Sequence, residues 1–241
     1  MGYAIETFNL TKVFPDFENP FAFRKIDKKV VLKDINIQVR PGEIFCIIGP
    51  NGSGKTTLLK ILATLIAPTS GSAKIAGFDI EKDEEKVKAS IGLVVGAERS
   101  IYWRLTGREN LEFYAILHRL NQREIIKEIG ILSEILELGD FLDKKVMEYS
   151  TGMRQRLCLA RGLLNHPRVL LLDEPTKSLD IQAANNLRNL IRKELVQKMG
   201  VTVVFSTHQQ DEVRFLSDRV ALIENGSIKV IKKPEEVEFF C

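Results

Sequence analysis

Short, largely apolar runs alternate with segments of helical hydrophobic spacing along most of the chain. Residues 44–48, 91–95, 169–172 and 201–205 are apolar runs of strand length, as expected for strands buried on both faces of a parallel sheet. Between them, leucine and isoleucine recur at three- and four-residue intervals, which predicts helices over 55–66, 152–164, 181–199 and 209–216. Strands that alternate with helices predict an α/β fold with right-handed crossovers.

Two regions interrupt this alternation. Polar and apolar residues alternate over 4–10 and 30–39, which predicts strands separated by a long loop at 15–29, and a strand or hairpin is expected over 72–80. A further strand pair is expected around the turn Asn225-Gly226. Residues 106–146 have helical spacing throughout, opened by Thr106 and Glu109 at capping-box spacing. This block predicts an α-helical subdomain inserted into the sheet.

The composition of the chain excludes several classes of protein but does not identify a function. The chain has 241 residues, 44% of them hydrophobic and 28% charged, which is typical of a folded domain and not of a disordered chain. A net charge of +3 gives no reason to expect nucleic acid as a partner. No signal peptide is evident and no apolar run approaches the length of a membrane span. The cysteines Cys46, Cys158 and Cys241 lack metal-ligand spacing, and the first two are expected to be buried.

The first chemical motif is a phosphate-binding loop at residues 49–56, GPNGSGKT, between an apolar strand and a helix. Its glycines let the backbone curve closely and direct N–H groups at phosphate oxygens, helped by the positive end of the following helix. Lys55 is expected on the β- and γ-phosphates and the Thr56 hydroxyl on Mg²⁺. The predicted nucleotide-binding residues here are Gly49, Pro50, Asn51, Gly52, Ser53, Gly54, Lys55, Thr56 and Thr57.

Three further candidate residues follow later strands. Asp173 and Glu174 end the apolar run 169–172, at the sheet edge where ligands of parallel sheets bind. Asp173 is expected to hold Mg²⁺, and Glu174 to orient or deprotonate the attacking water. His208 follows the next apolar run and is expected to emerge at the same edge, as a donor to the γ-phosphate. His118 and His166 have no such context, and His166-Pro167 indicates only a helix-ending turn.

Residues 149–156, YSTGMRQR, come shortly before the Asp173-Glu174 strand. With the phosphate loop, Ser178-Leu179-Asp180 and His208, they closely resemble the nucleotide-binding subunit of ATP-binding cassette (ABC) transporters, over essentially the whole chain. The resemblance implies a P-loop NTPase (RecA-like) parallel-sheet core with an antiparallel β subdomain and an inserted α-helical subdomain. It implies one domain over 1–241, with 1–95 and 160–241 as nucleotide-binding core and about 97–159 as the helical signature subdomain.

The resemblance also implies a mechanism. Two copies stack head to tail, so that ATP on one phosphate loop is capped by Ser150 and Gly152 of the partner, at a helix N-terminus that attracts phosphate. Asp180 is expected at the dimer seam, and Phe14 occupies the place where the family stacks an aromatic side chain on adenine. Hydrolysis of ATP would drive a separate membrane permease, with the subunit cytoplasmic and peripheral at the inner face of the membrane.

The chain departs from the usual family pattern at two places. The signature Leu-Ser-Gly-Gly-Gln has Tyr149, Thr151 and Met153 in place of its Leu, first Gly and Gln, a form that resembles ATPases of ABC-2 exporters. After residues 91–95 the family places a glutamine that senses Mg²⁺ and water. Here the residues are Gly96, Ala97 and Glu98. Either Glu98 takes the role of the glutamine, or backbone groups and water take it.

The aromatic segment around Trp103 has two interpretations: a groove for a cytoplasmic helix of the permease, or local packing. The alternative function is a non-transport ABC ATPase acting on nucleic acid or ribosomes. Those proteins usually carry two cassettes or a long coiled-coil arm, and this chain shows one cassette and no arm. A GTPase is disfavoured because no Asn-Lys-x-Asp-like guanine-reading segment is present.

Overall fold

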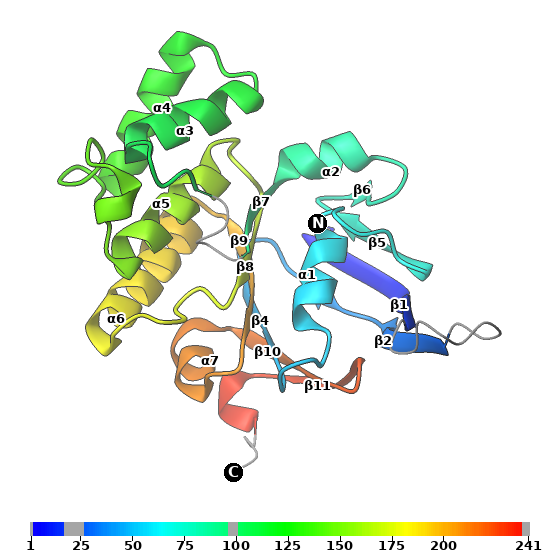
Figure 1. The fold of residues 1–241 in the computed structure, drawn as a ribbon. Helices are drawn as coiled ribbons and strands as arrows, with labels where there is room; N and C mark the ends of the chain where they lie inside the picture. The colour runs from blue at the N-terminus through cyan, green and yellow to red at the C-terminus, as the bar shows by residue number, and fades with distance from the viewer. Residues whose placement is uncertain (1, 17–26, 96–100, 238–241) are drawn as a thin grey trace.

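The computed structural model describes residues 2–16, 27–95 and 101–237. Its larger sheet has the strand order β11-β10-β4-β9-β8-β7 (Figure 1). Strands β10, β4, β9, β8 and β7 pair in parallel, and β11 pairs with β10 in antiparallel fashion. The strands are β4 (Ile44–Ile48), β7 (Ile91–Val94), β8 (Val169–Asp173), β9 (Thr202–Thr207), β10 (Arg219–Glu224) and β11 (Ser227–Lys232). The predicted parallel sheet is confirmed.

The apolar strands are buried on both faces, as their continuous hydrophobicity predicts. In β4, Cys46 contributes to one hydrophobic core while Phe45 and Ile47 contribute to the other. In β8, Leu170 and Leu171 divide in the same way. The two cores therefore lie on opposite faces of the sheet, and the sheet becomes the rigid centre of the molecule.

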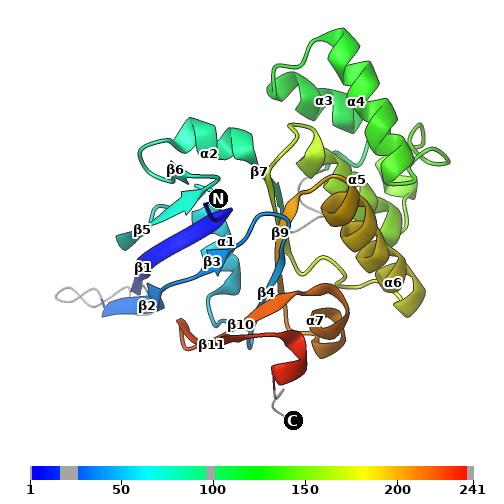
Figure 2. The ribbon, with the colours of Figure 1, turned by 180° about the vertical axis from the view of Figure 1, so that it is seen from behind.

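Helices cover both faces of this sheet. α5 (Thr151–Leu163) and α6 (Ile181–Leu190) lie on one side, and α1 (Lys55–Leu62) with the smaller sheet lies on the other (Figures 1 and 2). α7 (Gln210–Leu216) contacts β4 and α6. The predicted helix over 181–199 is present, but beyond α6 it widens to π geometry over Ile191–Lys198. α1 ends before the predicted residue 66, because Thr64 adopts a left-handed conformation with φ 57°.

The smaller, antiparallel sheet contains β1 (Ile5–Asp16), β2 (Asp27–Ile35), β3 (Gln38–Val39), β5 (Ser70–Ile75) and β6 (Phe78–Asp79). Strands β5 and β6 form the hairpin expected over 72–80. The predicted loop at 15–29 was too long, because β1 and β2 continue into it and pair as far as Asp16 with Asp27. Strand pairing across the sheet outweighs the proline and charge that favoured a loop there.

The helical block lies between β7 and β8 in sequence and packs beside α5 (Figure 1). It contains α3 (Gly107–Leu117), opened by the predicted Thr106–Glu109 capping box, and α4 (Gln122–Ile135). The prediction of helix up to residue 146 was wrong. After α4, Glu137 adopts a left-handed backbone conformation that ends the helix. Irregular turns follow, up to a short 3-10 helix at Val146–Glu148.

The short helix α2 (Glu84–Ser90) was not predicted. It buries Val87 beside β6 and β7. Its seven residues make only about two turns, too few for a clear amphipathic pattern. Within the described ranges, no helix combines the length and the apolar composition that crossing a bilayer requires.

Candidate functional site

The site forms where three neighbouring strands of the larger sheet end. β9 lies between β4 and β8, pairing Thr207 with Ile48 and Ser206 with Asp173. The residues that follow β4 and β8, and His208 after β9, therefore emerge together at one edge of the sheet. This arrangement is the one in which open parallel sheets bind ligands.

The phosphate loop depends on glycine at defined points. A Cβ added at Gly49 would lie 2.1 Å from the Ile223 carbonyl oxygen, and one at Gly54 would lie 2.6 Å from Leu32 Cδ2. Gly54 also has φ 107°, which side-chain-bearing residues rarely adopt. The loop is thus pressed against β2 and β10, so these glycines shape it before any ligand arrives.

The polar groups of the loop fit a phosphate-bearing ligand. Lys55 is almost fully buried, and its Nζ donates to the carbonyl oxygens of Gly49 (2.7 Å) and Pro50 (2.9 Å). Burial lowers the pKa of Lys55, while the nearby carboxylates of Glu174 and Asp173 act to raise it. The buried Ser53 hydroxyl has no hydrogen-bond partner. A buried hydroxyl rarely stays unpaired, so it is available to an oxygen of a ligand.

Thr56 and Asp173 meet across the gap between α1 and β8. The Thr56 hydroxyl donates to Asp173 Oδ2 at 2.9 Å and lies 3.2 Å from Oδ1. The Ser206 hydroxyl donates to Asp173 Oδ1 from the neighbouring strand. A hydroxyl beside a carboxylate is an oxygen donor set that suits a hard cation such as Mg²⁺.

Glu174 is held in a constrained position. Its backbone is left-handed at φ 49°, and its N–H donates to the Ser206 carbonyl oxygen at 3.0 Å. Its carboxylate oxygens have different neighbours: Oε1 lies 2.9 Å from His208 Nδ1, and Oε2 lies 2.8 Å from Lys177 Nζ. Burial raises the pKa of Glu174, but the hydrogen bonds from Lys177 and His208 outweigh burial and lower it. The carboxylate is therefore ionised over the neutral pH range.

A cavity of about 250 Å³ opens in front of these groups. It is lined by Val31, Asn51, Gly52, Gly54, Lys55, Thr56, Thr57 and Glu174. Phe14 lies outside this lining, half-buried on β1, with Lys12 Nζ 4.8 Å from its ring centre. Gly96, Ala97 and Glu98 lie outside the described residues.

The signature residues line a separate cavity, also about 250 Å³, next to α6. Ser150 caps α5 by accepting from the Met153 N–H at 3.2 Å, and Gly152 lies in the first turn. Asp180 caps α6 by accepting from the Ala183 N–H at 2.8 Å. Since the two cavities share no lining residue, Ser150 and Gly152 do not complete the phosphate-loop site within one chain.

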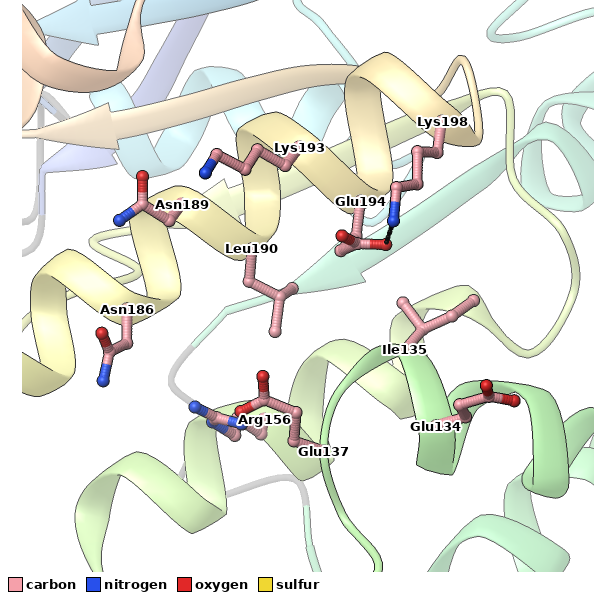
Figure 3. Close-up of a pocket in the computed structure, with 10 residues that line it drawn as sticks. All are labelled: Glu134, Ile135, Glu137, Arg156, Asn186, Asn189, Leu190, Lys193, Glu194 and Lys198. Carbon is pink, nitrogen blue, oxygen red and sulfur yellow. Dashed lines mark hydrogen bonds and ion pairs between the residues drawn. The ribbon is translucent and has the colours of Figure 1, made fainter.

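A third cavity, about 550 Å³, separates α4 and α5 from α6 and the π segment (Figure 3). Lys198 turns toward Glu194, with 2.8 Å between Nζ and Oε2, and Arg156 pairs with Glu137. These pairs neutralise two of the positive charges that line the cavity.

Sequence reasoning missed Lys177 and Ser206 in the site. Ser206 ends an apolar strand beside β8, and Lys177 comes three residues after Glu174, so a turn over 174–177 was the available signal. Trp103 is 43% exposed on the helical block, and its ring lies 5.2 Å from the Arg154 guanidinium carbon. Both the groove and the packing interpretation of Trp103 agree with this placement.

Comparisons with known proteins agree with this geometry. A family model described as ABC transporter matches residues 32–177. The ABC transporter ATP-binding protein NatA of Bacillus subtilis is 38% identical over 205 residues, which cover 84% of this chain and 82% of NatA. Among solved structures, CbiO1 from Clostridium perfringens, part of the transporter complex cbiONQ, has a TM-score of 0.85 and 25% identity, covering 98% of this chain and 90% of its own.

The ATP-binding cassette MJ0796, solved as a dimer in a post-hydrolysis state bound to ADP and Pi, is similar as well. Its TM-score is 0.82 at 30% identity, covering 95% of this chain and 98% of its own. The fold and the phosphate loop define a P-loop NTPase. The chain belongs to the ABC transporter family, as an ATP-binding subunit that hydrolyses ATP.

Proposed function

We propose that this subunit binds Mg·ATP in the cavity in front of the phosphate loop and hydrolyses it between two copies of the chain. Lys55 exchanges its bonds to loop carbonyls for the β- and γ-phosphates, and Ser53 supplies a buried hydroxyl. Thr56 and Asp173 would hold Mg²⁺, which neutralises phosphate charge when bound. The observation that carries this proposal is the meeting of Thr56, Asp173, Glu174 and His208 where β4, β8 and β9 end.

Glu174 is proposed as the residue that orients or deprotonates the attacking water. It lines the same cavity as Lys55 and is held ionised by its neighbours. His208 contacts its Oε1 through Nδ1. Nε2 is then proposed to reach the γ-phosphate as a donor in the imidazolium form, the only form in which both ring nitrogens donate. Glu174 and His208 would thus bring a base and a hydrogen-bond donor to the terminal phosphate, and Lys55 would add a positive charge there.

The second half of the site is proposed to come from a second copy. Ser150 and Gly152 lie at the N-terminus of α5, where free N–H groups and the helix dipole favour phosphate. Their cavity is separate from the phosphate loop in the single chain, so a twin placed head to tail would supply them. Asp180 would lie at the seam. That the similar cassette MJ0796 was solved as a dimer in a post-hydrolysis state supports the pairing of two copies.

The helical block, about residues 97–159, is proposed to contact a separate membrane permease. Tyr102, Trp103 and Met147 expose 48%, 43% and 60% of their surface there, an apolar area suited to a cytoplasmic helix. The subunit would then work peripherally at the inner face of the membrane. The form of the signature favours a permease of the ABC-2 exporter type. Residues 1–95 and 160–241 are proposed as the nucleotide-binding core, with Phe14 against the adenine.

The test is Glu174→Gln, which keeps the shape of the side chain and removes its base. ATP turnover should fall by about 10²–10⁴-fold, and the variant should form a long-lived dimer with ATP and Mg²⁺ in gel filtration. Glu194→Gln, in a comparable pair with a lysine but outside the lining of the phosphate-loop cavity, is the matched control. Wild-type turnover by Glu174→Gln would contradict the assignment of the base.

The dimer is tested separately. Gly152→Asp places a carboxylate where the partner's γ-phosphate is expected, while a Cβ at Gly152 meets only ordinary contacts within its own chain. Added to Glu174→Gln, it should abolish the ATP-dependent dimer and leave binding of fluorescent ATP to the single subunit unchanged. A dimer that persists would contradict the head-to-tail arrangement.

A further inference from the structure

A buried carboxylate lies behind the site. Glu212 comes four residues after His208 in the first turn of α7, and it is 1% exposed. The Thr176 hydroxyl donates to its Oε1 at 2.7 Å. The Thr207 hydroxyl acts to lower the pKa of the same carboxylate, as a neighbouring donor does. Both threonines are buried themselves. A buried carboxylate lowers the stability of the fold relative to an apolar side chain of similar size. The burial of Glu212 therefore suggests a role in function.

The two threonines are tied to the two residues that face the nucleotide. Thr176 follows Glu174 by two residues, and Thr207 immediately precedes His208. Glu174 and His208 contact each other on the open side, at 2.9 Å. Two hydrogen-bonding contacts, Thr176 with Glu212 and Glu174 with His208, therefore join the segment after β8 to the segment after β9.

Further contacts support this arrangement. The Gln209 N–H donates to the Thr207 hydroxyl oxygen at 3.0 Å, which fixes that side chain as α7 begins. Burial raises the pKa of Glu212, while the hydroxyls of Thr207 and Thr176 and the positive charge of Arg188 act to lower it. Arg188 lies on α6, the helix that Asp180 caps. Through its hydrogen bond with Thr176, Glu212 joins the segment that runs from Glu174 to Asp180 to the helix that follows His208.

We propose that Glu212 is a positioning residue: through Thr176 and Thr207 it sets the relative placement of Glu174 and His208 at the terminal phosphate. This inference rests on the proposed roles of those two residues. Neither hydroxyl touches the nucleotide cavity, so loss of Glu212 should act on turnover and not on nucleotide affinity. A misplacement of about 1 Å at reacting groups can lower turnover by about 10²-fold.

The test compares variants of the whole subunit with ATP and Mg²⁺. Glu212→Leu keeps the volume and removes the carboxylate, and it should lower kcat by about 10- to 100-fold while the affinity for fluorescent ATP stays unchanged. Glu212→Gln should restore most of kcat, because its amide can accept from Thr176 and donate to Thr207. Asp211→Asn, an exposed acid of the same helical turn, is the matched control.

A second variant separates positioning from folding. Glu212→Leu leaves the buried Thr176 hydroxyl unpaired, so it is combined with Thr176→Val, which removes that hydroxyl. The double variant should regain thermal stability and keep the low kcat. Recovery of kcat together with stability would overturn the proposal, since it would show that Glu212 serves folding alone.

The loss of kcat in Glu212→Leu must also depend on the pair of Glu174 and His208. In a His208→Ala background, Glu212→Leu should lower kcat by much less than it does in the wild type, because the group that it places is gone. An undiminished loss would overturn the proposal. If Glu174→Gln and His208→Ala themselves leave turnover intact, the proposed function fails instead, and the two failures are thereby distinguished.

Discussion

Lys177 and Glu174 form an ion pair three residues apart, with 2.8 Å between Nζ and Oε2. The turn that joins them is fixed by the Lys177 N–H, which donates to the Glu174 carbonyl oxygen at 3.1 Å. Lys177 is largely exposed while Glu174 is mostly buried, so the ammonium covers the carboxylate from the solvent side. The candidate base is thus engaged by a cation on one oxygen and by histidine on the other.

Lys177→Ser should shift the acid limb of the kcat–pH profile to higher pH. Burial raises the pKa of Glu174, and the hydrogen bond from Lys177 lowers it. Because Lys177→Ser removes that hydrogen bond, the pKa of Glu174 should rise. At a given acidic pH, a smaller fraction of the base is then ionised. Steady-state ATPase rates across pH measure the effect.

Lys177→Arg keeps the charge and should leave that limb in place. Lys198→Ala removes a similarly exposed lysine from a similar pair with Glu194, away from the site, and serves as control. A limb that moves to lower pH with Lys177→Ser would contradict the role given to this ion pair.

Gly49→Ala should abolish ATP binding or destabilise the fold, because the new Cβ would lie 2.1 Å from the Ile223 carbonyl oxygen. Gly130→Ala is the matched control: it lies exposed within α4, where a Cβ meets nothing within 4 Å. Alanine there should raise stability by about 0.5–1 kcal/mol through helix propensity. Thermal unfolding and nucleotide titration of both variants check this, and equal behaviour would contradict the packing of the loop against β10.

Lys55→Ala should abolish measurable ATP binding, since it removes the cation buried behind the loop. Its ammonium also holds two loop carbonyl oxygens, so unfolding must be followed in parallel with binding. Lys60→Ala, in the last turn of the same helix, should bind ATP normally. Tight binding by Lys55→Ala in a folded protein would show that the backbone of the loop suffices.

Trp103→Ala should leave basal ATPase largely intact and remove its coupling to the permease. The indole is partly exposed and lies beside Arg154, away from the phosphate loop. ATPase of the isolated subunit, compared with transport in vesicles that contain the permease, separates the two effects. A parallel loss of both, with a lower melting temperature, would favour local packing as the role of Trp103.

The sequence by itself determined the parts that are local. The phosphate loop is one contiguous segment, and its glycines and Lys55 can be recognised wherever a strand precedes it and a helix follows it. The capping box at Thr106 can be recognised from Thr106 and Glu109 alone. Largely apolar runs indicated β4, β7, β8 and β9, because strands buried on both faces carry no polar alternation. Asp173, Glu174 and His208 were placed at one edge by the rule that parallel strands end together.

The tertiary structure decided the contacts that depend on strand order and on chain reversal. Only the placement of β9 beside β8 brings Ser206 to Asp173, and only α7 folding back brings Glu212 to Thr176, 36 residues away. Hydrophobic periodicity does not encode which strands are neighbours, so these partners had no local signal. Pairing between β1 and β2 likewise extended both strands into a segment whose composition favours a loop, because ladder hydrogen bonds outweigh weak local preference.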